Sequence, residues 1–357
     1  MRRSLLAPLL ATCALAGEVR TVDVPAGGRV PDVVAAGAVV HMVWGAEGDA
    51  FYGRSEDGGR AFGAPLRVNR KDGECGAFGE RGPKLAVSSD GTVHVVWQPS
   101  RLVGIRYARL APGASAFEAP RELLAAGAVA EGVTIAAGGS SVLVVYLDGK
   151  SGAPANSPLG LPLFAVGSSD GGATFGAPGP LANDYDGGAC ACCNLQAALD
   201  GEGRFVVAFR GAKDAVRDLF LLRGDAEGKA FHTVRVSRED WVQNGCPMDG
   251  PRLCARGDDL FVAYTVKTRA AFSRVRGDES APPVRPQRLG EGAKQAIVLA
   301  NGDDELLLAW MDREGSLRWE LLGKDGAVLS AGDAGAVRQG SRPAGFVDAE
   351  GGFVLVR

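Results

Sequence analysis

The fold is decided by a unit that reads PKLAVSSDGTVHVVW at residues 83–97. A short apolar strand after Pro83 leads into the turn residues Ser89-Asp90-Gly91, and a second apolar strand ends in Trp97. Apolar runs of this length, rich in Val and bounded by Gly or Asp, are typical of buried β-strands and not of helices. The unit therefore predicts two neighbouring strands joined by a tight turn.

The same unit recurs along the chain. Its copies begin near residues 31, 83, 133, 194, 251, 295 and 343. Other second strands also end in an aromatic residue, as at Trp44, Tyr146, Phe209, Tyr264 and Trp310. A repeat of about fifty residues with four short strands is the sequence signature of a propeller. We therefore predict an all-β fold, a β-propeller of four-stranded antiparallel blades, with seven blades favoured and six as the alternative.

The two ends of the chain predict how the ring closes. The seventh copy stops at Arg357 after two strands, while the strand-like segment Val19–Val24 has no blade of its own. Because an unpaired strand edge is a liability, we expect these two segments to pair and to close the ring.

Composition agrees with a large folded domain and argues against some functions. The 52 glycines are about twice the average usage and lack the period of collagen, so they indicate many tight turns. A hydrophobic content of 46% in 357 residues is enough to fill a core. The net charge of −3 is mixed along the chain, so no nucleic-acid partner is predicted.

Residues 1–16 differ in kind from the rest. Arg2-Arg3 precede a short apolar segment, which is the pattern of a secretory signal peptide. Two processing sites remain open: cleavage after Ala14-Leu15-Ala16, or a lipobox that ends at Cys13 and would leave that residue lipidated. Either way we expect an exported protein, secreted or held as a periplasmic or cell-surface lipoprotein. Its contact with a membrane would be through the lipid anchor alone, and residues 17–357 would form a single domain.

Two turns carry a sharper signal. Residues 168–175 fit the S-x-D-x-G-x-T-[WF] Asp box at every defined position, and residues 55–62 fit all but the Thr. In such a box the Asp accepts backbone N–H bonds, a Gly supplies positive φ and the aromatic residue packs beneath the turn. The structural positions are Ser55, Asp57, Gly59, Phe62, Ser168, Asp170, Gly172 and Phe175. These boxes predict a folding device between third and fourth strands and no catalytic role.

With these boxes the chain resembles the sialidase superfamily of BNR, or Asp-box, repeat propellers. Catalytic members of that family use an arginine triad, a Tyr–Glu nucleophile pair and an Asp acid/base. Arg29-Val30-Pro31 is similar to the family's F/Y-R-I-P motif, which makes Arg29 a candidate substrate ligand, but Gly28 stands in place of the aromatic residue. The segment 45–49, where the Asp would follow, has no arginine, and no Tyr–Glu pair aligns. The resemblance leaves catalysis open; an active enzyme would be a sialidase-type glycoside hydrolase.

The cysteines form a second distinctive pattern. Cys75, Cys190, Cys192, Cys193 and Cys246 all fall on predicted inter-blade loops of one face. In an exported protein they favour disulfides that cross-link long loops. The alternative is a soft-ligand site for copper or zinc, but the spacing matches no zinc motif, and no cofactor is predicted. The segments 190–194 and 241–251 also resemble a pattern in exported sialidase-like proteins with a C-x-C-C loop.

The same face gathers aromatic and charged candidates for ligand binding. These are Asp184, Tyr185, Asp186, Arg217, Asp218, Trp241, Asp249 and Arg269. Such groups at a propeller mouth suit a sugar or a peptide. We therefore expect a monomeric glycan- or protein-binding module that acts through its cysteine-bearing face. An exo-α-sialidase or related glycoside hydrolase is the alternative, and a metal-binding propeller is the second alternative.

Overall fold

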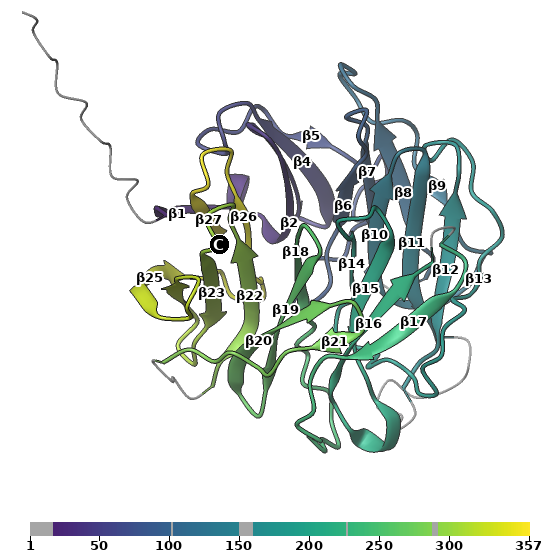
Figure 1. Ribbon diagram of the computed structural model, residues 1–357. Helices are drawn as coiled ribbons and strands as arrows, with labels where there is room; N and C mark the ends of the chain where they lie inside the picture. The colour runs from purple at the N-terminus through teal and green to yellow at the C-terminus, as the bar shows by residue number, and fades with distance from the viewer. Residues whose placement is uncertain (1–16, 101–102, 150–159, 226–227, 288–291) are drawn as a thin grey trace, which may run out of the picture.

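The computed structural model describes residues 17–100, 103–149, 160–225, 228–287 and 292–357, and its seven β-sheets are the blades of a propeller (Figure 1). The predicted all-β fold and the count of seven blades are confirmed. The predicted signal peptide, residues 1–16, and the lipidation candidate Cys13 lie outside the described residues. Among those residues, no helix has the length and apolar character needed to cross a membrane.

Six blades have four antiparallel strands each. Blade 1 contains β2 (Arg29–Ala36), β3 (Val39–Ala46), β4 (Asp49–Ser55) and β5 (Leu66–Arg67). Blade 2 contains β6 (Lys84–Val87), β7 (Val93–Trp97), β8 (Arg106–Leu110) and β9 (Arg121–Glu122). Blade 3 contains β10 (Ala130–Gly138), β11 (Ser141–Asp148), β12 (Leu163–Ser168) and β13 (Gly179–Pro180). Blade 4 contains β14 (Gln196–Leu199), β15 (Phe205–Arg210), β16 (Leu219–Gly224) and β17 (Phe231–Arg235).

Blade 5 contains β18 (Arg252–Arg256), β19 (Asp259–Val266), β20 (Arg269–Arg276) and β21 (Glu279–Ser280). Blade 6 contains β22 (Lys294–Ala300), β23 (Leu306–Met311), β24 (Ser316–Leu322) and β25 (Val328–Ala336). Blade 7 contains β26 (Ala344–Val347) and β27 (Phe353–Val356), and β1 (Val19–Val22) adds its third strand. Short 3₁₀ turns lie at Pro25–Gly27 and Lys213–Ala215.

The apolar second strands are explained by the packing of blade against blade. In β15, Val206 and Ala208 pack against blade 5, whereas Val207 and Phe209 pack against blade 3. Successive side chains of a strand point to opposite faces, so a strand between two neighbouring blades must be apolar at every position. Seven apolar layers of this kind lie between the seven pairs of adjacent blades.

The first strand of every blade lies at the centre of the ring. β2, β6, β10, β14, β18, β22 and β26 contact one another in this order, and β26 returns to β2. These seven strands surround the central channel. The loops that lead into them from the preceding blades therefore meet at one mouth of the channel.

The ring closes through the two ends of the chain, as the sequence predicts. β1 runs parallel to β27, with Val19 opposite Phe353 and Val22 opposite Val356. The seventh blade thus has three strands, and its outer strand is parallel to the middle one. Val354 and Val356 of β27 pack against blade 1, while Phe353 and Leu355 pack against blade 6.

The turn at residues 168–175 joins β12 to β13 and is held by its own side chains. Asp170 accepts hydrogen bonds from the Ser168 hydroxyl at 2.8 Å, the Thr174 amide at 2.8 Å and the Thr174 hydroxyl at 2.6 Å. These donors, the Thr174 hydroxyl first, lower the pKa of Asp170. Phe175 packs edge-on against Tyr107 of blade 2, with ring centroids 4.7 Å apart. A Cβ at position 172 would collide with the Tyr107 hydroxyl, so this turn requires Gly172.

The turn at residues 55–62 has the same construction between β4 and β5. The Ser55 hydroxyl donates to Asp57 and accepts from the Gly59 amide, and Asp57 accepts from the amides of Arg60 and Ala61. Phe62 packs against the apolar layer between blades 7 and 1. In both turns the Ser and Asp side chains are therefore hydrogen-bonded within the turn itself.

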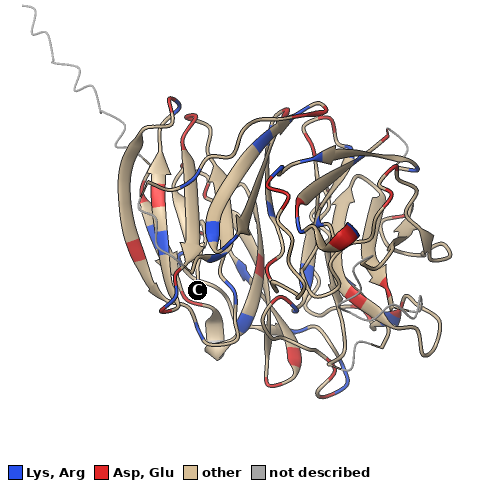
Figure 2. Ribbon diagram, turned by 90° about the horizontal axis from the view of Figure 1, so that it is seen from below, with Lys and Arg blue, Asp and Glu red and all other residues tan. Residues whose placement is uncertain are grey.

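Charges of both signs are interspersed over the strands and loops (Figure 2). Many form ion pairs, such as Arg276 with Asp259 at 2.8 Å and Arg318 with Asp312 at 2.8 Å. No stripe of one sign follows the outer strands in this view. Surface charge alone therefore does not identify a functional site.

Closure of the ring through β27 predicts that a buried residue of this strand contributes strongly to the free energy of unfolding. Leu355 is fully buried between blades 6 and 7, so Leu355→Ala should lower the free energy of unfolding by about 3 kcal/mol through lost burial and a residual cavity. Leu329→Ala on the outer strand of blade 6, where the side chain is 48% exposed, is the matched control and should change it by less than about 0.5 kcal/mol. Chemical denaturation of the two variants measures the difference. Equal losses would contradict closure through β27.

Candidate functional site

A cleft of about 640 Å³ opens at the mouth of the channel where the inter-blade loops meet. Blade 1 contributes Arg29 and the hairpin residue Glu47, and the loop before blade 2 contributes the widest share of the wall. The wall also includes residues 98–100 of blade 2, Cys192 before blade 4, Met248 before blade 5 and Arg338 before blade 7. This volume lies within the range of small-molecule sites.

A β-bulge directs Arg29 into the cleft. The register of β2 against β3 shifts between Arg29 and Asp32, and Val30 within the bulge has a φ of 52°. A β-branched residue rarely adopts this conformation, and strain of this kind persists only where surrounding contacts impose it. The amide of Val30 donates to the Ser341 hydroxyl at 2.8 Å, which holds the bulge in place. Arg29 itself makes no ion pair with any residue that the structure describes.

The loop before blade 2 sends two side chains in opposite directions. Phe78 and Arg81 exchange backbone hydrogen bonds of 2.9 and 3.1 Å, which form a tight turn around Gly79 and Glu80. Phe78 is 63% exposed and packs one edge of its ring on Gly340. Glu80 is 2% exposed, and its carboxylate lies against Arg342 and the Gly250 amide. The turn thus offers an aromatic ring to solvent and buries a carboxylate.

The buried carboxylate of Glu80 forms the floor of the cleft. It accepts from Arg342 Nη1 at 3.1 Å, from the Gly250 amide at 3.0 Å and from Gln295 Nε2 at 3.4 Å. Asp249 lies beside it and accepts from the Gln295 amide and the Thr265 hydroxyl. Burial, and then the negative charge of Glu80, raise the pKa of Asp249 to about 6. The floor is therefore a polar network in which the carboxylates of Glu80 and Asp249 are both hydrogen-bonded.

A second set of charges lies along the first strands, farther inside the channel. Lys84 is 3% exposed, its ammonium nitrogen lies 3.8 Å from Asp32 Oδ1, and it has no hydrogen-bond partner among the described residues. Burial lowers the pKa of Lys84 to about 7 and that of Arg252 to about 9. Arg252 donates to the carbonyl of Pro343 at 3.0 Å. The channel thus holds cations that burial keeps poorly solvated.

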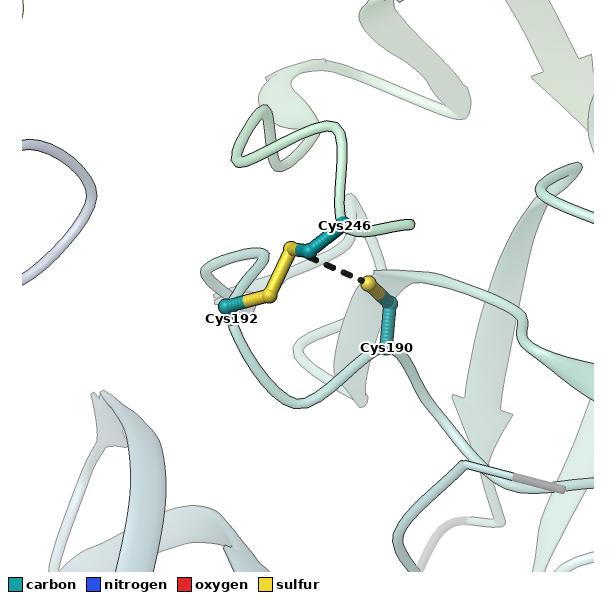
Figure 3. A group of neighbouring side chains, drawn as sticks. All are labelled: Cys190, Cys192 and Cys246. Atoms are coloured by element: carbon teal, nitrogen blue, oxygen red, sulfur yellow. Dashed lines mark hydrogen bonds between the residues drawn. A yellow bond between two sulfur atoms is a disulfide. The ribbon is translucent and has the colours of Figure 1, made fainter. Parts of the chain in front are cut away.

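The cysteines of two neighbouring loops meet beside the cleft. Cys192 and Cys246 form a disulfide whose Cα atoms are 6.4 Å apart, and it joins the loops before blades 4 and 5 (Figure 3). The free thiols Cys190 and Cys193 pack against the same bond, together with Ala212. Cys75 lines the cleft as a buried free thiol, and burial raises its pKa. Cys254 is a free thiol in the first strand of blade 5.

The positions of the sulfur atoms show whether the cysteines could form the alternative copper or zinc site. Those of Cys190, Cys192 and Cys246 lie within 4.8 Å of one another, so three thiolates there would suit copper or zinc. The disulfide, however, withdraws two of the three thiolates. In this oxidised form the cluster offers sulfur redox chemistry in preference to metal binding.

None of the eight predicted ligand-face residues lines the cleft. The described lining includes Arg29 but none of Asp184, Tyr185, Asp186, Arg217, Asp218, Trp241, Asp249 and Arg269. Arg217, Asp218 and Asp249 are buried, and Asp218 binds Arg235 and Ser237. The others are exposed or half-buried; Asp184 binds His232 at 2.7 Å and Asp186 binds Lys213 at 2.5 Å. Trp241 lies under the guanidinium group of Arg210.

Sequence patterns do not predict several residues of the cleft, among them Phe78, Glu80, Arg81 and Arg338. Each stands alone in a loop with no motif around it. The one available signal is Phe78, a large aromatic residue in a glycine-rich polar loop between Cys75 and the second repeat, where no strand pattern requires it.

No family model matches the chain, and no curated protein matches its sequence. Among solved structures, the chain is similar to the BP39L lectin from Burkholderia pseudomallei, with 13% identity over 92% of this chain and 94% of the lectin and a TM-score of 0.67. The Hadza microbial sialidase Hz136 shows 13% identity over 91% of this chain and 74% of that chain, with a TM-score of 0.55. An α-L-arabinofuranosidase from Fusarium graminearum shows 11% identity over 83% and 92%, with a TM-score of 0.54. At such identities the similarity shows the propeller fold.

The buried Lys84 predicts a pH dependence of stability. Between pH 7 and 10.5 the unfolded chain holds the Lys84 proton more tightly than the folded chain, so stability should rise with pH through this window and fall as the pH returns to 7. Lys84→Met has no titratable amine at this position, so it should remove this rise of stability with pH. Denaturant titrations across this window measure it. The exposed Lys294→Met is the control; a Lys84→Met profile parallel to the parent's would show that Lys84 causes no such dependence.

Proposed function

We propose that this protein is an exported, sialidase-like Asp-box propeller that binds glycans in the cleft at its channel mouth. The observation that carries the proposal is the pairing of an exposed aromatic ring, Phe78, with the unpaired Arg29 in one cleft. A sugar ring has an apolar face that stacks on an aromatic side chain, and hydroxyl or carboxylate groups that a planar guanidinium group binds in a forked geometry. The lectin and glycosidases of similar fold support a sugar ligand.

Charge favours an acidic glycan over a neutral one. Three arginines line the cleft, Arg29, Arg81 and Arg338, against the exposed carboxylate of Glu47. Arg81 pairs with Glu131, and Arg338 donates to the carbonyl of Gly27, so Arg29 is the guanidinium group with the most freedom to bind a ligand. A carboxylate-bearing sugar would meet this group directly.

The three arginines also favour a second candidate function, that of an exo-α-sialidase. The described lining, however, contains no Tyr and no Asp, which the family's nucleophile pair and acid/base would require. Its carboxylates are Glu47 and Glu80, and Glu80 is already bonded to Arg342 and Gly250. Binding without hydrolysis therefore agrees better with the cleft.

Mutation of the cleft tests the proposal on the mature chain. A glycan array that includes acidic sugars should identify a ligand, and Phe78→Ala and Arg29→Ala should each weaken its binding by about tenfold, ~1.4 kcal/mol. Leu329→Ala on β25 and Arg274→Ala on β20 are the matched apolar and basic controls outside the cleft and should bind as the parent does. Calorimetric titration gives the affinities.

The outcomes separate the candidates. Absence of any sugar binding, or binding that both cleft variants leave unchanged, would refute a glycan site in this cleft. Hydrolysis of a fluorogenic sialoside that Arg29→Ala abolishes would instead establish the sialidase. A protein ligand retained on the parent chain and lost from both variants would identify a peptide-binding cleft.

The proposed export rests on residues 1–16 and is tested separately. We expect the protein isolated from its own cells to begin at Gly17 or at a lipidated Cys13. The intact mass and the N-terminal peptide distinguish the two forms. A chain that keeps Met1 to Ala16 would contradict both.

A further inference from the structure

The four cysteines between blades 4 and 5 form one packed group. Cys192 and Cys246 share the disulfide, and Cys190 Sγ lies 3.7 Å from Cys246 Sγ (Figure 3). Cys190 and Cys193 are free thiols with 3% and 1% exposure, and all four side chains pack together around Ala212. A thiol in van der Waals contact with one sulfur of a disulfide is the arrangement from which thiol–disulfide exchange begins.

We propose that this group is a thiol–disulfide exchange centre, in which the Cys190 and Cys193 thiols reduce the Cys192–Cys246 disulfide. In the first step the Cys190 thiolate attacks Cys246 Sγ, the Cys190–Cys246 bond forms, the Cys192–Cys246 bond breaks and Cys192 leaves as a thiolate. In the second step Cys193, after giving its proton to the Cys192 thiolate, attacks Cys190, and Cys246 leaves as a thiolate. Two electrons pass from Cys190 and Cys193 to Cys192 and Cys246, so the exchange needs no external oxidant or reductant.

The surroundings of the two thiols assign their roles. The Cys193 side chain hydrogen-bonds to Cys190, and the guanidinium groups of Arg217 and Arg210 lie nearby; together they lower the pKa of Cys190. Burial, and then the hydrogen bond to Cys190, raise the pKa of Cys193. Cys190 is therefore the thiolate that attacks, and Cys193 holds the proton.

The backbone is ready for the second bond. The amide of Cys193 donates to the carbonyl of Cys190 at 3.2 Å, which makes residues 190–193 a tight turn. Such a turn holds its first and fourth Cα atoms within about 7 Å, close to the range that a disulfide spans. A Cys190–Cys193 disulfide thus fits the loop without a new fold.

Exchange would change the wall of the cleft. The Cys192–Cys246 disulfide cross-links two loops, whereas a Cys190–Cys193 disulfide lies within one loop and leaves them unlinked. Cys192 lines the cleft, so it would become a free thiol there. This inference stands independently of the glycan proposal, because its readout is the set of sulfur atoms that are bonded.

Trapping of the intermediate tests the proposal on the full chain. Protein prepared without reductant is quenched with acid, alkylated, digested and mapped by mass spectrometry. Cys193→Ala blocks the second step, so it should accumulate the Cys190–Cys246 disulfide with Cys192 alkylated, several-fold above the parent protein. Cys190→Ala should keep Cys192–Cys246 as its linkage within the group.

Cys254→Ser, in another part of blade 5, is the control and should map as the parent does. Cys192–Cys246 as the sole linkage in Cys193→Ala at neutral and alkaline pH would overturn the proposal. A native mass that shows bound copper or zinc with all four cysteines free would also overturn it. Circular dichroism checks folding; should Cys193→Ala fail to fold, pulsed alkylation of the parent protein replaces it, and a Cys192 that never labels refutes exchange.

Discussion

A single carboxylate, that of Glu80, ties four of the seven blades together at the mouth of the channel. Glu80 belongs to the loop before blade 2, and it binds Arg342 before blade 7, the Gly250 amide before blade 5 and Gln295 of blade 6. Because Glu80 and Arg342 are both almost fully buried, neither charge tolerates the loss of its partner. The relative positions of the inner loops therefore depend on this network. The network gives the cleft above it a rigid floor. Because Glu80 is already hydrogen-bonded, it cannot act as a free base toward a ligand.

The same network connects the cleft to the cysteine group through very few residues. The Cys193 sulfur accepts a hydrogen bond from the Asp249 amide at 3.4 Å. The amide of the next residue, Gly250, donates a hydrogen bond to Glu80. A Cβ at position 250 would collide with the backbone of Asn194, so Gly250 allows the loops before blades 4 and 5 to touch. Sulfur chemistry, the floor of the cleft and its wall at Met248 thus share one short segment. A change in which cysteines are bonded to one another would therefore also alter the cleft.

The sequence predicts the scaffold well and the site poorly, for separate physical reasons. Each second strand packs between two blades, so its apolar run recurs seven times and marks every blade, as in Val207 and Ala208 of β15. The loops do not pack between blades, so no repeated apolar pattern marks their functional residues in the sequence. Asp218 and Asp249 have the residue type of a ligand-binding group, yet the fold buries both and uses them to bind Ser237 and Thr265. Arg29 reaches the cleft through a bulge that needs Ser341 from the far end of the chain, and no local pattern encodes that contact.

The two faces of the propeller differ in how completely their polar groups are used. On the face of the Ser-x-Asp turns, Asp57 and Asp170 are engaged by hydroxyl and amide donors of their own turn, so these turns complete themselves without a ligand. At the channel mouth, Arg29 has no ionic partner in the described structure and Phe78 is mostly exposed. Exposed aromatic surface beside an unpaired charge gains free energy when a ligand covers one and neutralises the other. Because propellers of this shape share so little sequence, it is this unsatisfied chemistry at the mouth, and not the scaffold, that must decide what the protein binds.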